Sequence, residues 1–174
     1  MPEYRARMVA TPPAQALTLR PIGVVRCDYT RRFGTPQQAS AVDSHREATI
    51  ELDAALIPPE ALADLAGMSH IWVISWLNRS SGTWSPTVRP PRGTREQRGV
   101  LATRSPDRPN PIGLSAIALM SVDGCTLHVR GVDLLDGTPV LDIKPYVPYA
   151  DAFPEARAGW IDAIPRAALQ IAKR

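Results

Sequence analysis

The chain has 174 residues, of which 44% are hydrophobic and 21% charged, and its formal net charge is +3. This length fits one domain with a sizeable core. No apolar run is long enough for a signal peptide or a membrane span, so we expect a cytoplasmic protein with no membrane partner. Cys27, Cys125 and three scattered histidines lack the spacing of metal ligands, which predicts no metal site.

The first third of the chain predicts an arm, two strands and a helix. Residues 1–16 are polar and are expected to form a flexible arm, which leaves 17–174 as the domain. Residues 17–26 and 45–53 alternate between apolar and polar side chains, which is typical of strands. Residues 58–67 begin with proline and end with glycine, so they predict a helix.

The rest of the chain is predicted to be mostly strand. The predicted strands are 70–77, 100–103, 114–122, 126–132 and 140–143. The strand at 70–77 is mostly apolar, which predicts burial on both faces or nearly so. Asp123-Gly124 is a strong hairpin signal, and Asp136-Gly137 predicts a second turn. A short helix at 165–173 is expected to close the domain.

Short strands, hairpin turns and little helix predict a mainly β, single-domain protein whose antiparallel sheet curls or closes, with a few short helices. The eleven glycines fall in neither a G-x-G-x-x-G nor a Walker pattern. A Rossmann nucleotide site is therefore disfavoured.

Two arginine-bearing segments point to an anionic partner. TRSPDRPNPIGLS (103–115) holds Arg104, Arg108 and Asn110 on a loop stiffened by three prolines. The loop at 77–98 carries Arg79, Arg89, Arg92, Arg95 and Arg98. Guanidinium groups bind phosphates and carboxylates well, so this second loop predicts an RNA-phosphate patch, with Trp84 as an open candidate for base stacking. The alternatives are a solvated surface loop and a genome rich in arginine codons.

Two further segments carry unusual polar groups. FGTPQQ (33–38) offers two amides after a proline turn. VDLLDGTPVLDIKPY (132–146) contains Asp133, Asp136 and Asp142, which are many carboxylates for one short hairpin. We expect Arg104 and Arg108, or a cationic ligand, to neutralise them. The alternative is a structural hairpin with a solvated lysine.

ATRSPDRPNPIGLS, VRPPR, FG-x-P-x-Q and DLLDGTPVLDIKPY occur here in an order that resembles the TrmO (TsaA-like) family, over roughly residues 18–150. The resemblance implies a small non-Rossmann β-barrel and S-adenosylmethionine-dependent methylation of tRNA. The acceptor it implies is the exocyclic amine of threonylcarbamoyl-adenosine, the nucleotide just 3′ of the anticodon. It also implies a homodimer with the cofactor near the subunit interface.

Carried over by position, the resemblance assigns the cofactor to Pro36, Gln37, Gln38, Asn78, Arg79, Arg104, Leu114, Val132, Asp133, Leu134, Leu135 and Asp136. Gln37 stands where the family usually has arginine, and Asn78 stands where it usually has histidine. These two departures replace a cation and a titratable ring by amides.

Catalytic and RNA-binding roles are assigned from residue chemistry. Asn110, followed by proline, is expected to accept hydrogen bonds from the substrate amine and so localise its lone pair. Asp142 or Tyr146 is expected to take the proton that the amine loses after methyl transfer. The expected RNA contacts are Arg89, Arg92, Arg95, Arg108 and Lys144. Two alternatives remain: a methyltransferase of this fold that acts on another RNA or on a small molecule, and a noncatalytic RNA-binding barrel.

Overall fold

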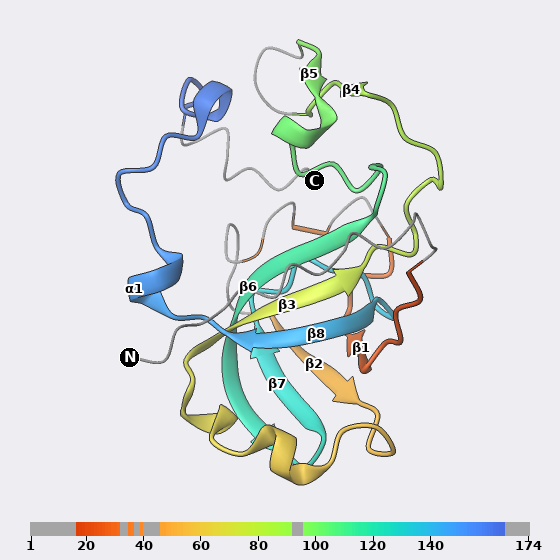
Figure 1. The fold of residues 1–174 in the computed structure, drawn as a ribbon, viewed down its shortest axis with the longest axis vertical. Helices are drawn as coiled ribbons and strands as arrows, with labels where there is room; N and C mark the ends of the chain where they lie inside the picture. The colour runs from red at the N-terminus through yellow and green to blue at the C-terminus, as the bar shows by residue number, and fades with distance from the viewer. Residues whose placement is uncertain (1–16, 32–34, 37–38, 40–45, 92–95, 166–174) are drawn as a thin grey trace, which may run out of the picture.

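Six antiparallel strands close into a barrel in the order β1-β2-β7-β6-β3-β8, with β8 pairing back to β1 (Figure 1). The strands are β1 (Gly23–Arg26), β2 (Glu47–Leu52), β3 (His70–Trp76), β6 (Ile112–Asp123), β7 (Thr126–Arg130) and β8 (Pro139–Pro145). The structure is a computed structural model that describes residues 17–31, 35–36, 39, 46–91 and 96–165. The prediction of a mainly β antiparallel barrel is confirmed.

The remaining elements are short. A two-stranded ribbon, β4 (Thr87–Val88) with β5 (Arg98–Gly99), lies beyond one end of the barrel (Figure 1). The helical elements are η1 (Pro59–Leu62), η2 (Leu65–Gly67), η3 (Val100–Ala102), α1 (Pro148–Asp151) and η4 (Gly159–Ile161). In the described part of the chain, no helix has the length and apolar character needed to cross a bilayer.

Side chains that alternate along the strands fill the barrel. Ile71 and Val73 of β3 point inward and are fully buried, as are Ile50, Leu127 and their counterparts on the other strands. Of the outer side chains of β3, Trp72 and Ile74 are half-buried whereas His70 and Trp76 are exposed, and the Tyr146 ring lies tilted against Trp72 with ring centroids 5.4 Å apart. The predicted burial of β3 on both faces is therefore right for the inner face and only partly right for the outer face.

The two predicted turns form, one of them shifted. Asp123 pairs with Thr126, so the two-residue loop between β6 and β7 is Gly124-Cys125, one position later than predicted. Gly124 takes a φ of 54°, which a two-residue hairpin loop needs at its first position. Gly137 takes a φ of 75° and turns the chain toward β8, as predicted.

One predicted strand is shorter than expected, and two predicted elements are wrong. Only the last four residues of 17–26 form a strand, since Pro21 has no N–H for a sheet ladder. The stretch 58–67 forms two 3₁₀ turns, which are separated at Asp64, whose φ is 63°. Of this stretch, Leu62 and Leu65 pack against the core, and the three residues per turn of a 3₁₀ helix match their spacing. Residues 100–102 form a 3₁₀ turn, closed by a 2.8 Å bond from Thr103 Oγ1 to the Val100 carbonyl.

Two predictions fall beyond the described residues. They are the arm at 1–16 and the helix at 165–173 apart from its first residue.

Candidate functional site

One end of the barrel gathers several chain segments that are far apart in sequence. We call this end the rim; its segments are 27–30, 77–80, 109–111 and 131–138. The backbone N–H of Leu77 donates to the Pro111 carbonyl over 2.7 Å, which joins the end of β3 to the start of β6. The N–H of Asp136 donates to the Tyr29 carbonyl over 2.8 Å, which joins the β7–β8 link to the end of β1.

Arg79 and Asp136, two predicted cofactor residues, meet at the rim. The Nη1 of Arg79 donates to the Thr30 carbonyl over 3.2 Å, and its Nη2 lies 3.7 Å from where a Cβ on Gly137 would be. The Oδ1 of Asp136 accepts a bond from the Cys27 N–H over 3.2 Å. The exposed guanidinium of Arg79 thus lies over the same turn that the Asp136 carboxylate anchors.

Asp133 connects three more of the predicted segments. Its Oδ1 accepts a 2.6 Å hydrogen bond from Ser115 Oγ on β6, and its carboxylate also accepts the backbone N–H of Ala39. Burial raises the pKa of Asp133, while hydrogen bonds from Ser115, from the Ala39 N–H and from its own N–H, together with the positive charge of Arg104, lower it; burial dominates. The Ser115 and Ala39 contacts were not predicted, although a serine at an inward position of an alternating strand is a signal that could have found Ser115.

The two arginines of the proline-rich loop have different surroundings. The Nη1 of Arg108 donates to two carbonyls of its own loop, those of Thr103 over 3.2 Å and Ser105 over 3.4 Å. Arg108 therefore braces the loop from inside, and its predicted contact with RNA stays a prediction. Arg104 is exposed, and its charge acts on Asp133.

Leu114 and Asp142 share a row on the outer face of the barrel. Both are paired with Ile74 of β3, one from each side. Adjacent strands are about 4.8 Å apart, so these two residues are separated by roughly 10 Å. Leu114 is 58% exposed, and the Oδ2 of Asp142 forms a 2.8 Å ion pair with Lys144. A ligand against Leu114 is therefore within reach of Asp142.

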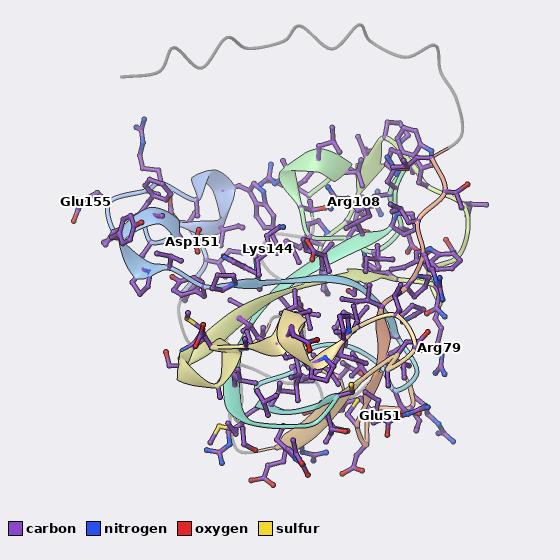
Figure 2. All side chains as sticks on the ribbon, turned by 60° about the horizontal axis from the view of Figure 1, so that its bottom comes forward. Glu51, Arg79, Arg108, Lys144, Asp151 and Glu155 are labelled. Atoms are coloured by element: carbon purple, nitrogen blue, oxygen red, sulfur yellow. The ribbon has the colours of Figure 1, made fainter. Side chains whose placement is uncertain are left out.

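Tyr146, the other predicted proton acceptor, lies at the far end of the barrel from the rim. It contacts His70 and Trp72, and its N–H donates to the His70 carbonyl over 3.1 Å. His70 is eight residues before Asn78 along β3, which is about 26 Å at 3.3 Å per residue. Because β8 runs antiparallel to β3, the end of β8 lies beside the start of β3. Tyr146, which follows β8, is therefore far from the site residues at the rim. Figure 2 likewise shows Lys144 near Asp151 and both away from Arg79.

Asn78 and Asn110 are both at the rim. Asn78 directly follows Leu77, and Asn110 directly precedes Pro111, whose carbonyl holds Leu77. Both side chains are exposed. The structure therefore brings these two amides close in space although 32 positions separate them in sequence.

The other predicted residues divide into three groups. Val132 and Leu134 are buried in the core, so only their main-chain groups are available to a ligand, whereas Leu135 and Pro36 are half-buried. Arg89 is exposed next to β4. The residues that lie outside the described part of the chain are Gln37, Gln38, Arg92 and Arg95.

A separate shallow hollow of about 620 Å³ lies over the outer side of β1, β2 and β7. Its lining includes Arg26, Asp28, Thr49, His128 and Asp136, and of the predicted site residues that the structure describes, only Asp136 reaches it. Within the described ranges, no cluster of His, Cys, Asp and Glu side chains could hold a metal ion.

Comparison with known proteins identifies relatives of this architecture. The model of the tRNA-methyltransferase O N-terminal domain matches residues 24–152. A tRNA (adenine(37)-N6)-methyltransferase of Escherichia coli is 40% identical over 156 residues, which cover 86% of this chain and 66% of the relative. A putative S-adenosylmethionine-dependent methyltransferase of Pseudomonas aeruginosa is 43% identical over 154 residues, which cover 85% of this chain and 64% of the relative.

The fold is shared as well. The crystal structure of TrmO from Pseudomonas aeruginosa has a TM-score of 0.68 at 40% sequence identity and covers 87% of this chain and 65% of that one. The chain spans about two thirds of the length of each of these relatives. Since the domain model matches most of its residues and curated relatives are at least 40% identical, the chain belongs to the TrmO family.

Proposed function

We propose that this protein is an S-adenosylmethionine-dependent methyltransferase that modifies the exocyclic amine of an adenine in tRNA. The observation that carries the proposal is the convergence of Arg79, Arg104, Asp133 and Asp136 at one barrel rim from separate segments of the chain. The names of the relatives support the same activity. We further propose threonylcarbamoyl-adenosine beside the anticodon as the acceptor nucleoside, in line with the sequence motifs.

The polar groups at the rim fit the chemistry of this cofactor. The guanidinium groups of Arg79 and Arg104 suit a carboxylate, and both are exposed. The Asp136 carboxylate and the main-chain groups around it suit an ammonium or ribose hydroxyls, while the exposed Leu114 suits the flat face of an adenine ring. When bound, the cofactor supplies an electrophilic methyl group on sulfur.

Two residues are proposed to act on the substrate amine. The Asn110 amide oxygen would accept N–H bonds from the amine, which localises the nitrogen lone pair. Asp142 would take the proton released on methylation, and its place in the Leu114 row supports it over Tyr146. Positioning the two reactants on rigid strands supplies much of the rate enhancement.

RNA binding is assigned to the surface that adjoins the rim. Trp84 is 52% exposed, and Arg89 nearby in the chain is exposed too. The N–H of Ser81 donates to the Asp107 carboxylate over 2.9 Å, which ties the segment before Trp84 to the proline-rich loop. An exposed indole and a guanidinium on adjoining, braced loops suit a base and a phosphate.

We also propose a symmetric homodimer. Trp76 and Ile112 are 48% and 44% exposed and are paired on the outer face of β3 and β6, next to Leu114. A second copy that covers this apolar strip would sit beside the proposed cofactor position. Light scattering is expected to give twice the chain mass at micromolar concentration; a monomer mass would contradict the dimer.

Two experiments test the function. Calorimetry of the purified, metal-free protein is expected to show binding of S-adenosylmethionine, and a folded protein that gives no heat at millimolar cofactor would contradict the proposal. Nucleoside mass analysis of tRNA from a deletion strain is expected to lack one methylated adenosine. Cofactor binding together with an unchanged tRNA profile would point instead to another RNA or a small molecule as the substrate.

A further inference from the structure

Trp160 joins the C-terminal segment to the two-stranded ribbon β4–β5. Figure 1 shows η4, which carries Trp160, at the same end of the molecule as the ribbon. The indole Nε1 donates to the Ala102 carbonyl of η3 over 2.9 Å. The Arg98 guanidinium of β5 lies over the same indole, 5.6 Å from the ring centroid. One side chain therefore contacts both a strand of the ribbon and the turn that follows it.

Two apolar side chains of these segments are buried outside the barrel. Val100 of η3 is 3% exposed, and Ile164, four residues after Trp160, is 8% exposed. In the part of the chain that the structure describes, they are the only buried hydrophobic side chains that do not belong to the barrel core. Together with the Trp160 bond, their burial indicates a second, smaller packing unit formed by η3 and the C-terminal segment.

The turn that carries Trp160 is held by its own residues. Gly159 has a φ of 62°, a left-handed conformation that glycine adopts at little cost. The Ala158 N–H donates to the Asp162 carboxylate over 2.8 Å, which closes the turn around Trp160. The indole is therefore placed by the fold and needs no ligand to reach η3.

A further bond connects η3 to the surface proposed to bind RNA. The Val100 N–H donates to the Pro86 carbonyl over 2.9 Å. Pro86 stands two residues after Trp84 and directly before β4, and Arg89 directly follows β4. The attachment of η3 thus lies between the exposed indole and the exposed guanidinium that are proposed to contact a base and a phosphate.

Arg98 has surroundings unlike those of Arg89. Its side chain is 31% exposed, forms an ion pair with Glu96 and faces the Trp160 ring. A guanidinium over an aromatic face is stabilised by the ring quadrupole, and more so where water is partly excluded. Arg98 therefore helps to hold β5 against the C-terminal segment, whereas Arg89 is exposed on the other strand's end.

We propose that Trp160 is a positioning residue for the RNA-binding surface: it fastens β5 and η3, and so holds Trp84 and Arg89 in place for tRNA, without contacting the RNA itself. This inference rests on the proposed function, because it concerns the same RNA surface. A surface that is already ordered loses less conformational entropy on binding. Trp160 lies beyond residues 24–152, which match the family's domain model.

The cofactor site is expected to keep its shape without Trp160. The proline-rich loop has bonds of its own, from Arg108 to the Thr103 carbonyl and from the Ser81 N–H to Asp107. Loss of Trp160 should therefore weaken tRNA binding much more than cofactor binding.

Trp160→Ala tests the proposal. We expect its Val100 amide to exchange hydrogen at least tenfold faster by NMR and its tRNA affinity to fall about tenfold by filter binding. Its affinity for S-adenosylhomocysteine, measured by calorimetry, is expected to stay within about twofold of the wild type. In turnover the KM for tRNA is expected to rise about tenfold, with kcat at saturating tRNA nearly unchanged.

Two further variants sharpen the result. Trp160→Phe keeps a ring beneath Arg98 but lacks the donor to Ala102, so both losses are expected to be smaller, about threefold; it carries the test if the alanine variant does not fold. Phe153→Ala removes a 74% exposed aromatic side chain from the same C-terminal segment. This matched control is expected to change neither affinity nor Val100 exchange.

A double-mutant cycle separates positioning from direct contact. If Trp160 acts by holding Arg89 in place, Arg89→Ala costs less tRNA affinity once Trp160 is already alanine. The double variant is then expected to bind tRNA at least about threefold more tightly than the two single losses multiplied together predict. An additive cycle would mean that Trp160 acts on the RNA independently of Arg89, and would overturn the inference.

Three other outcomes would also overturn it. Unchanged Val100 exchange in Trp160→Ala would mean that the indole does not fasten η3. Fast exchange with unchanged tRNA affinity would mean that the fastened unit does not serve RNA binding. An equal loss of cofactor and tRNA affinity would mean that Trp160 supports the rim instead. A wild-type protein that binds no tRNA would contradict the proposed function itself, and the exchange comparison would then still decide whether Trp160 fastens η3.

Discussion

Gly113→Ala is expected to destabilise the protein and to disturb the rim. Gly113 pairs with Ser75 across β3 and β6. A Cβ there would overlap Ser75 Oγ and lie 3.0 Å from the Cδ2 of Leu77. Ser75 is 0% exposed, so it has no free space to move into. Overpacking of this kind costs roughly 1–3 kcal/mol, which is about 2–12 °C in melting temperature at this chain length.

A double-mutant cycle tests whether the Ser75 hydroxyl is the cause. Among the described residues this hydroxyl has no hydrogen-bond partner, so Ser75→Ala alone is expected to leave stability level or raise it by up to about 1 kcal/mol. Without Oγ the nearest neighbour of the added methyl of Gly113→Ala is the Leu77 side chain, which can adjust. The double variant is therefore expected to recover at least about 1 kcal/mol beyond additivity.

Urea and thermal unfolding of the wild type, the two single variants and the double variant measure the four stabilities that the cycle needs. Calorimetry with S-adenosylhomocysteine measures whether the cofactor affinity at the rim changes. Leu77 directly precedes Asn78 and Arg79, so Gly113→Ala is expected to weaken cofactor affinity and the double variant to restore part of it. An additive cycle, or a Gly113→Ala protein as stable as the wild type, would refute the packing described for this strand pair.

Two other predictions concern the site loops and the outer face. Arg104→Ala is expected to weaken cofactor binding, measured by calorimetry, about ten- to a hundredfold. Arg89→Ala is expected to leave cofactor affinity unchanged and to reduce the slope of tRNA affinity against salt by at most about one unit, measured by filter binding across a salt series. The reverse pattern would mean that the two loops are misassigned. The pKa of Asp151 is lowered by the Val147 N–H and then by the Trp72 indole, so its contribution to stability is present at neutral pH and lost as the pH falls through that lowered pKa. Asp151→Asn is expected not to show this loss of stability at acidic pH. If its stability varied with pH as that of the wild type does, the assigned role of Asp151 would be contradicted.

The sequence was informative where local pattern decides structure. Alternation predicted β2, a mostly apolar run predicted β3, and the Asp123-Gly124 hairpin signal helped to predict β6 and β7. Local pattern was misleading at 58–67. Proline and glycine there suggest a helix, but only Leu62 and Leu65 of this stretch pack against the core, and it forms two 3₁₀ turns. Local pattern also did not reveal the pairing of β1 with β8 that closes the barrel, since such pairing depends on register between distant segments.

The sequence identified which segments form the site but not how their side chains are arranged. The motifs pointed to the loops that meet at the rim, and Arg104 was assigned to the cofactor and Arg108 to RNA although both stand in the same loop. Only the structure shows that one of them bonds its own loop carbonyls. Asp142 and Tyr146 were alternative proton acceptors in the sequence, whereas in the structure Asp142 pairs with Ile74 in the middle of β3 and Tyr146 lies beside His70 at the start of β3.

We propose that this protein transfers a methyl group to an adenine amine of tRNA. The most direct measurement incubates the protein with methyl-labelled S-adenosylmethionine and tRNA that carries threonylcarbamoyl-adenosine, and then analyses the nucleosides by mass spectrometry. The account predicts one labelled methyl group on the exocyclic nitrogen of that nucleoside, and none when the amine already bears a methyl group. A protein that binds both cofactor and tRNA but leaves every adenosine unlabelled, or that places the label on a ribose, would contradict it.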